Sequence, residues 1–93
     1  MNYLSVDIGT TRCKCQLFAE DGTILDYLFE DYSFKRIDGE KYVDVDAVVA
    51  CVQRMIGQIE KKREISSVCI SSLGESFVLL DKDDNVLFYP IIT

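Results

Sequence analysis

The chain has 93 residues, 48% of them hydrophobic and 28% charged, a composition that permits a packed core and excludes a disordered tail. Sixteen acidic and ten basic residues leave a net charge of −6. This balance argues against a nucleic-acid partner and against binding to an anionic membrane surface, because both need clustered lysine and arginine.

No membrane-spanning segment and no secretory signal are predicted. No apolar run approaches the ~20 residues that cross a bilayer. Asp7 interrupts the apolar start of the chain, and no cleavage site follows it. We therefore expect a cytoplasmic protein of one small domain.

The four cysteines predict neither a zinc site nor a disulfide framework. Their spacing contains no Cys-x-x-Cys pair, and the sequence has no histidine. We expect Cys13, Cys15, Cys51 and Cys69 to be reduced, mostly buried thiols that act as small hydrophobes.

The first third of the chain predicts a three-stranded antiparallel meander. An apolar run over residues 3–7 indicates a buried strand that breaks into a turn. Alternating residues over 13–19 indicate a second strand, and Asp21-Gly22 is typical of a tight hairpin turn. Renewed alternation over 23–33 indicates the third strand.

Four aromatic residues, Tyr27, Phe29, Tyr32 and Phe34, follow one another closely. In the third strand, alternation places Tyr27 and Phe29 on one face together with Leu25. We expect the aromatic cluster to pack between sheet and helix; the alternative is a binding patch.

A helix is predicted from Ala47 to Arg63, after a polar segment with a turn at Asp38-Gly39. Asp44 or Asp46 is expected to cap its start by accepting bonds from free backbone N–H groups. One helical stripe carries its apolar residues, namely Val48, Val52, Met55, Ile56 and Ile59.

The last third predicts a further strand and a second hairpin. Val68-Cys69-Ile70 is typical of a central strand covered on both faces. Residues Phe77–Asp81 and Val86–Ile92 indicate a hairpin across a polar turn at 82–85. The order strand, strand, strand, helix, strand matches the start of a ribonuclease H-like domain, so we expect an α/β fold that is α+β in the portion present. Because that fold normally continues with further helices and strands, we expect the chain to be a truncated, incomplete domain.

The segment that carries chemistry covers residues 7–14, at the turn after the first strand. Gly9 has no Cβ, so the backbone there can approach a phosphate and present N–H groups to it. Thr10 and Thr11 add hydroxyl donors, Asp7 suits a hydrated Mg²⁺, and Lys14 can neutralise phosphate charge. The segment therefore predicts a phosphate site; the alternative is a plain β-turn in which Asp7 accepts local backbone bonds.

The Asp7–Thr11 segment resembles the first phosphate motif of the sugar kinase, Hsp70 and actin superfamily. Three later segments are similar to the FGGY carbohydrate kinases: Tyr42–Asp46 before the helix, Ile70–Asp81, and Val86–Ile92. The resemblance implies that residues 1–93 are the N-terminal part of the first domain of a two-domain kinase, with the remainder and the second domain absent. It implies ATP and Mg²⁺ as cofactors and a sugar or polyol as substrate, and it leaves a homodimeric parent open.

The same resemblance implies site residues. For the phosphates of ATP these are Asp7, Gly9, Thr10, Thr11 and Lys14, with Asp7 also near Mg²⁺ through water. Gly74 and Glu75 fall on the loop that contacts substrate hydroxyls; the alternative for Glu75 is an exposed loop acid. The family's catalytic Asp lies beyond Thr93, so no catalytic residue is expected in this segment and the segment alone is expected to be inactive.

Two other classes of function remain as alternatives. One is an ATPase of the same superfamily that acts as a conformational switch. The other is a small α+β module without catalysis, which assembles through its exposed sheet.

Overall fold

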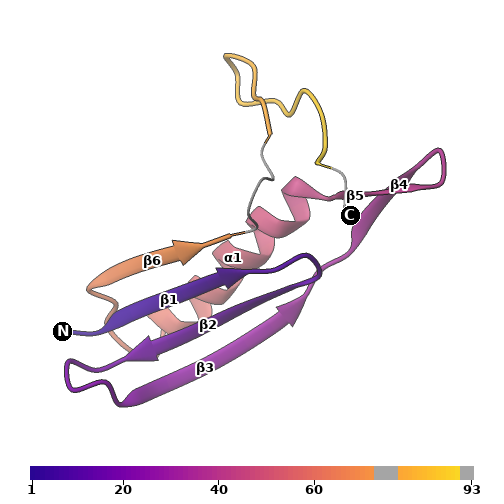
Figure 1. Ribbon diagram of the computed structural model, residues 1–93. Helices are drawn as coiled ribbons and strands as arrows, with labels where there is room; N and C mark the ends of the chain where they lie inside the picture. Colours follow the sequence, from indigo (N-terminus) through magenta and orange to yellow (C-terminus); the bar gives the residue numbers. More distant parts are fainter. Residues whose placement is uncertain (73–77, 91–93) are drawn as a thin grey trace.

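The structure, a computed structural model, describes residues 1–72 and 78–90. In these residues a four-stranded sheet is covered on one face by one helix, and a two-stranded hairpin projects from the end of this body (Figure 1). The strands are β1 (Tyr3–Ile8), β2 (Arg12–Phe18), β3 (Ile24–Asp31), β4 (Phe34–Ile37), β5 (Glu40–Val43) and β6 (Ser67–Ser71), and the helix is α1 (Val45–Glu60). The element order confirms the predicted ribonuclease H-like α/β fold.

Strand β1 lies inside the sheet, whose strand order is β3-β2-β1-β6. Strands β1, β2 and β3 are antiparallel neighbours, which confirms the meander, whereas β6 returns through α1 to run parallel to β1. Asp7, near the end of β1, pairs with Lys14 of β2 and with Ser71 of β6. The point at which the chain leaves β1 is therefore held by a strand on each side.

The core lies between the sheet and α1. Its buried residues come from alternate positions of β1 and β2 and from one stripe of the helix: Leu4, Val6, Cys13, Cys15, Leu17, Cys51, Met55 and Ile59. Burial raises the pKa of the Cys15 thiol to about 12, so this cysteine remains a neutral, small hydrophobe. All four cysteines are free, but Cys69 on β6 is exposed, and the prediction of burial was wrong for that residue.

Helix α1 begins after Asp44, whose carboxylate accepts a bond from the N–H of Ala47 at 3.2 Å, which confirms the predicted cap. It ends at Glu60 rather than at Arg63, because the chain tightens after it: the N–H of Lys62 donates to the carbonyl of Ile59, three residues back, at 3.0 Å. Within the described ranges no helix is long and apolar enough to cross a membrane.

A β-bulge between β2 and β3 corrects the predicted faces of β3. The register shifts at Leu17/Phe18, so that both Leu25 and Leu28 pack against the core. Tyr27 and Phe29 therefore face away from the helix and are 46% and 53% exposed. The prediction that they pack between sheet and helix was wrong, because simple alternation does not reveal an inserted residue. Tyr32 does pack against the core, as predicted.

Strand β6 was predicted to be central and covered, and this was wrong for the described part of the chain. Helix α1 packs against β2 and β3 and leaves β6 uncovered. Every residue of β6 is exposed, including Ile70 at 57%. The apolar composition of a strand shows that it suits burial, but it does not show which element supplies the cover.

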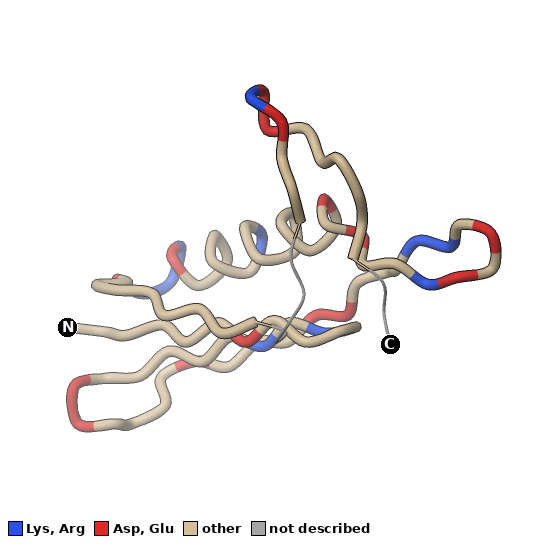
Figure 2. The backbone as a smooth tube through the Cα atoms, turned by 45° about the horizontal axis from the view of Figure 1, so that its top comes forward, with Lys and Arg blue, Asp and Glu red and all other residues tan. Residues whose placement is uncertain are grey.

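Hairpin β4–β5 confirms the turn predicted at Asp38-Gly39, where both residues have positive φ, 52° and 81°. Its two strands were not predicted, since charged residues occupy half of their positions (Figure 2). Cations resting on aromatic rings support them: the Lys41 ammonium lies 4.8 Å from the ring centre of Phe34, and the Lys35 ammonium lies 4.7 Å from that of Tyr89.

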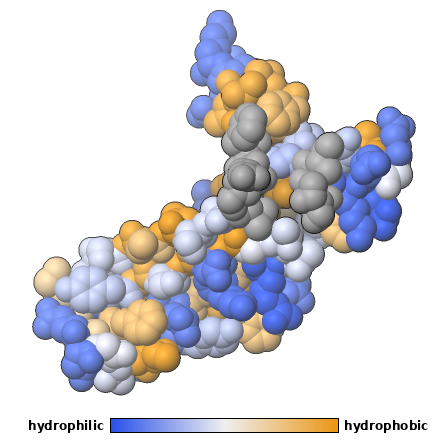
Figure 3. Space-filling model, in the orientation of Figure 1, coloured by the Kyte–Doolittle hydropathy of each residue, from blue (hydrophilic) through white to orange (hydrophobic). Residues whose placement is uncertain are grey.

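Residues 78–90 form the second hairpin as a single bridge, Leu80 to Val86, rather than as two full strands. The carboxylate of Asp81 closes its turn by accepting bonds from the N–H groups of Asp83 and Asn85 at 2.8 and 2.9 Å. Figure 3 shows that this hairpin projects from the rest of the molecule and has a hydrophilic tip with hydrophobic residues next to it. The N–H of Val43 donates to the carbonyl of Pro90 at 2.7 Å and ties the segment to β5.

The helix–sheet core predicts a stability difference between two positions of α1. Ile59→Ala removes a fully buried side chain and is expected to lower the free energy of unfolding by about 2–5 kcal/mol. Val49→Ala, on the same helix but 49% exposed, is the matched control and is expected to change it by less than about 0.5 kcal/mol. Urea unfolding followed by circular dichroism measures both; equal losses would contradict the packing described.

Candidate functional site

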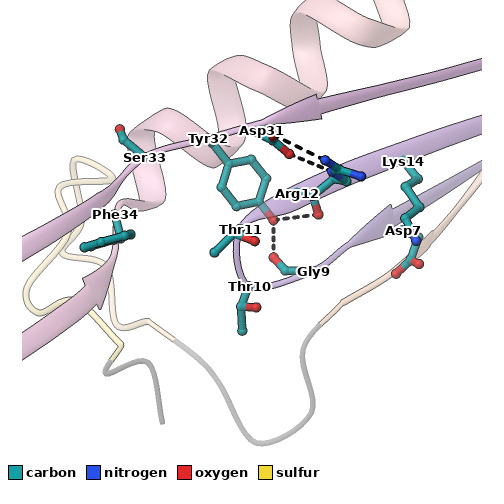
Figure 4. Close-up of a pocket in the computed structure, with 10 residues that line it drawn as sticks. All are labelled: Asp7, Gly9, Thr10, Thr11, Arg12, Lys14, Asp31, Tyr32, Ser33 and Phe34. Carbon is teal, nitrogen blue, oxygen red and sulfur yellow. Dashed lines mark hydrogen bonds and ion pairs between the residues drawn. The ribbon is translucent and has the colours of Figure 1, made fainter.

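A pocket of about 700 Å³ lies at the turn that joins β1 to β2 (Figure 4). It is lined by Asp7, Gly9, Thr10, Thr11, Arg12, Lys14, Asp31, Tyr32, Ser33 and Phe34. The first turn thus meets the segment that joins β3 to β4. All five residues predicted to bind phosphate line this one pocket, although their binding of phosphate stays a prediction.

Gly9 is required by the close approach of the two sides of the turn. A Cβ on Gly9 would lie 3.0 Å from the carbonyl oxygen of Arg12, tighter than ordinary contact. The N–H of Gly9 donates to that same oxygen at 2.8 Å. This changes the expected role of Gly9, because its amide closes the turn and is not free for a ligand.

The free amides belong to the next two residues. Among the described residues, the backbone N–H groups of Thr10 and Thr11 have no protein acceptor. Both threonines are exposed, so their hydroxyls and amides stand together at the tip of the turn. Adjacent backbone amides of this kind form a binding concavity for anionic oxygens.

Tyr32 holds the turn from outside. Its hydroxyl donates to the carbonyl of Gly9 and lies 3.2 Å from the carbonyl of Arg12, while its backbone N–H donates to the carbonyl of Thr11 at 3.0 Å. Burial raises the pKa of its hydroxyl to about 12, so the proton that it donates is retained at neutral pH. Tyr32 was predicted to pack between sheet and helix, with a binding patch as the alternative, and no local spacing signals its contacts with the turn.

Arg12 also lines the pocket, and no role was predicted for it. Its guanidinium bonds the carboxylate of Asp31 across β2 and β3, with 2.6 Å between Nε and Oδ1, and lies 4.4 Å from the ring centre of Phe29. The hydrogen bond from Arg12 lowers the pKa of Asp31. The pair is exposed, so it contributes little to stability. The Asp31 carboxylate nevertheless partly neutralises the charge of Arg12.

Asp7 and Lys14 face each other across β1 and β2 and extend from the same face of the sheet (Figure 4). The Ser71 hydroxyl lies 3.4 Å from the Asp7 carboxylate. Within residues 1–72 and 78–90 no group of three or more side chains is placed to hold a metal ion. One exposed carboxylate beside a phosphate site nevertheless suits Mg²⁺, which retains several waters and uses one or two carboxylates together with substrate phosphates.

Gly74 and Glu75, the residues predicted to bind substrate, lie outside the described residues. The structure therefore brings together the predicted phosphate site but does not place the predicted substrate loop.

The surroundings of Gly9 and Gly57 predict opposite effects on the free energy of unfolding when each is changed to Ala. Gly9→Ala forces its Cβ against a backbone oxygen and is expected to lower the free energy of unfolding by about 1–3 kcal/mol. Gly57→Ala, inside α1 with nothing within 4 Å of the new Cβ, is expected to raise it by about 0.5–1 kcal/mol. Urea unfolding distinguishes the two, and a Gly9→Ala protein as stable as Gly57→Ala would contradict this geometry.

Comparison with solved structures identifies sugar kinases. Gluconate kinase and ligand-bound xylulose kinase, both from Lactobacillus acidophilus, each match with a TM-score of 0.85 and 25% identity over 97% of this chain. Plasmodium falciparum glycerol kinase with ADP shares the fold, with a TM-score of 0.73 and 18% identity over 98% of this chain. The chain spans only 19–20% of the length of these three proteins.

Comparison with curated proteins found no match. A sequence profile of the FGGY family of carbohydrate kinases, N-terminal domain, matches residues 2–93, which is nearly the whole chain. That extent, the agreement of the fold with gluconate and xylulose kinases and the turn at the end of β1 lead to one conclusion: the chain belongs to the FGGY family of carbohydrate kinases.

Proposed function

We propose that residues 1–93 are the N-terminal part of the first domain of a cytoplasmic two-domain kinase that transfers a phosphoryl group from ATP to a hydroxyl of a sugar or polyol. Family membership supports the reaction class, and the chain's span of about one-fifth of its structural relatives supports its place in a longer protein. The observation that carries the proposal is a pair of backbone amides, at Thr10 and Thr11, that have no acceptor within residues 1–72 and 78–90 and lie beside Asp7 and Lys14 in one pocket.

In this proposal the turn binds the phosphates of ATP. The amides and hydroxyls of Thr10 and Thr11 donate to phosphate oxygens, and the Lys14 ammonium offsets their negative charge. Gly9 acts by allowing the backbone to close without a side chain. Such positioning and charge stabilisation is most of what phosphoryl transfer asks of a protein.

Asp7 is proposed to hold Mg²⁺ through water, which fits a single exposed carboxylate at the edge of a phosphate pocket. Bound there, the ion supplies charge neutralisation on the phosphates. Asp7 is not proposed as the general base. That role falls to a residue outside this chain, as does the adenosine pocket, so residues 1–93 alone are expected to show no turnover.

The substrate end of the site rests on Gly74 and Glu75. A carboxylate at Glu75 can accept bonds from two hydroxyls of a sugar or polyol and so orient the attacking one. Gluconate, xylulose and glycerol, the substrates named for three structural relatives, are the first compounds to test.

The proposal predicts that Asp7→Asn in the full-length protein lowers kcat at least ~100-fold with ATP and whichever of these compounds is accepted. The change removes the charge but leaves the size of an exposed side chain nearly the same, so folding should be unaffected. Asp83→Asn, on the exposed turn of residues 82–85, is the matched control and should keep wild-type turnover. An Asp7→Asn enzyme with unchanged turnover would remove Asp7 from the mechanism.

A further inference from the structure

The turn at the end of β1 differs from an ordinary two-residue hairpin turn. Tight hairpin loops of two residues favour primed turns, which need positive φ. The Asp38-Gly39 turn meets this requirement, with φ of 52° and 81°. Thr10 and Thr11 do not, because neither is among the described residues with positive φ. The backbone of the first turn therefore differs from that of the Asp38-Gly39 turn.

Tyr32 supports the first turn from outside its two strands, at three of its carbonyl oxygens. Its hydroxyl engages the carbonyl of Gly9, its backbone N–H engages the carbonyl of Thr11, and the carbonyl of Arg12 lies 3.2 Å from the same hydroxyl. Its ring is half-buried against the core, and this packing fixes the position of the hydroxyl. Figure 4 shows the phenol reaching the turn from the side of β3.

The bond to Gly9 also sets the direction of an amide. The peptide unit is planar and trans, so a carbonyl and the N–H of the following residue point in opposite directions. When the Gly9 carbonyl is held toward Tyr32, the N–H of Thr10 must point away from Tyr32. If this peptide turned over, a carbonyl oxygen would replace the N–H and repel an anion.

We propose that Tyr32 is a positioning residue for phosphate binding, whose hydroxyl holds the Gly9–Thr10 peptide so that the Thr10 amide is presented to the phosphates of a nucleotide. The proposal rests on the proposed function of the turn as the phosphate site and adds to it a residue from a separate strand connection. Tyr32 does not contact the phosphate in this role. The raised pKa of its hydroxyl is consistent with a group that remains a donor at working pH.

The test uses the full-length protein and the affinity for Mg·ADP and for adenosine, measured by calorimetry. Tyr32→Phe keeps the ring and removes the hydroxyl. It is expected to weaken Mg·ADP binding about tenfold, the effect of losing one hydrogen bond to a charged group, while adenosine, which has no phosphate, binds as before. Tyr3→Phe, at the opposite end of β1, is the control and should bind both as the wild type does.

Two results would overturn the proposal: Mg·ADP binding by Tyr32→Phe equal to that of Tyr3→Phe, or equal proportional losses of Mg·ADP and adenosine. The second would mark Tyr32 as merely structural. A measurement on the unmutated protein covers the case in which Tyr32→Phe fails to fold. Titration with inorganic phosphate should shift the amide NMR signal of Thr10 more than that of Gly9, and the reverse order would also overturn the proposal.

The outcomes separate this proposal from the proposed function. A wild-type protein that binds Mg·ADP but phosphorylates no sugar or polyol overturns the kinase reaction, while the comparison of Tyr32→Phe with Tyr3→Phe still decides the role of Tyr32. A wild-type protein that binds neither Mg·ADP nor phosphate overturns the role of Tyr32 together with the phosphate site.

Discussion

The contact on which the proposed phosphate site depends is the hydrogen bond between the Tyr32 hydroxyl and the Gly9 carbonyl. A turn that binds anions must leave its amides unpaired, and unpaired amides cannot stabilise the turn. In the β4–β5 hairpin the chain reverses direction through backbone conformations with positive φ at Asp38 and Gly39. In the first turn Tyr32, from the connection between β3 and β4, donates to the carbonyl oxygens of Gly9 and Thr11. Within the described part of the chain this leaves the amides of Thr10 and Thr11 without an acceptor.

Tyr32 can reach the turn because of the β-bulge opposite Leu17. The bulge determines that Leu28 and Glu30 of β3 face α1, where Glu30 forms an ion pair with Arg54. Tyr32 follows at the next alternate position and so lies on the same inner face, packed against the core. Without the shift, Tyr27 and Phe29 would take the inner face instead. An irregularity near the distant end of β3 thus decides which side chain is available to support the phosphate turn.

The parts of this arrangement that could be predicted from sequence are those that depend on residues close together in the chain. The Asp7–Thr11 motif, the meander and the cap at Asp44 depend on neighbours in the chain, and the structure places each of them as expected. The faces of Tyr27 and Phe29 could not be predicted, because a one-residue bulge has no signature in their alternation. The role of Tyr32 could not be predicted either, since it depends on two strands meeting in space. The exposure of β6 depends on where α1 packs, and the apolar residues of β6 do not indicate that position.

The charge of the chain explains why the amides matter. A net charge of −6 repels a nucleotide at long range, and salt weakens that field beyond about 8–10 Å. Arg12, which lines the pocket, is bonded to Asp31, so its charge is largely offset locally. Lys14 stands opposite Asp7 in the sheet register. In the proposed phosphate site, oriented dipoles at close range therefore act together with the Lys14 ammonium. Dipoles act only when their direction is fixed, and for that reason the proposed role of a neutral tyrosine that orients one peptide bears directly on phosphate binding.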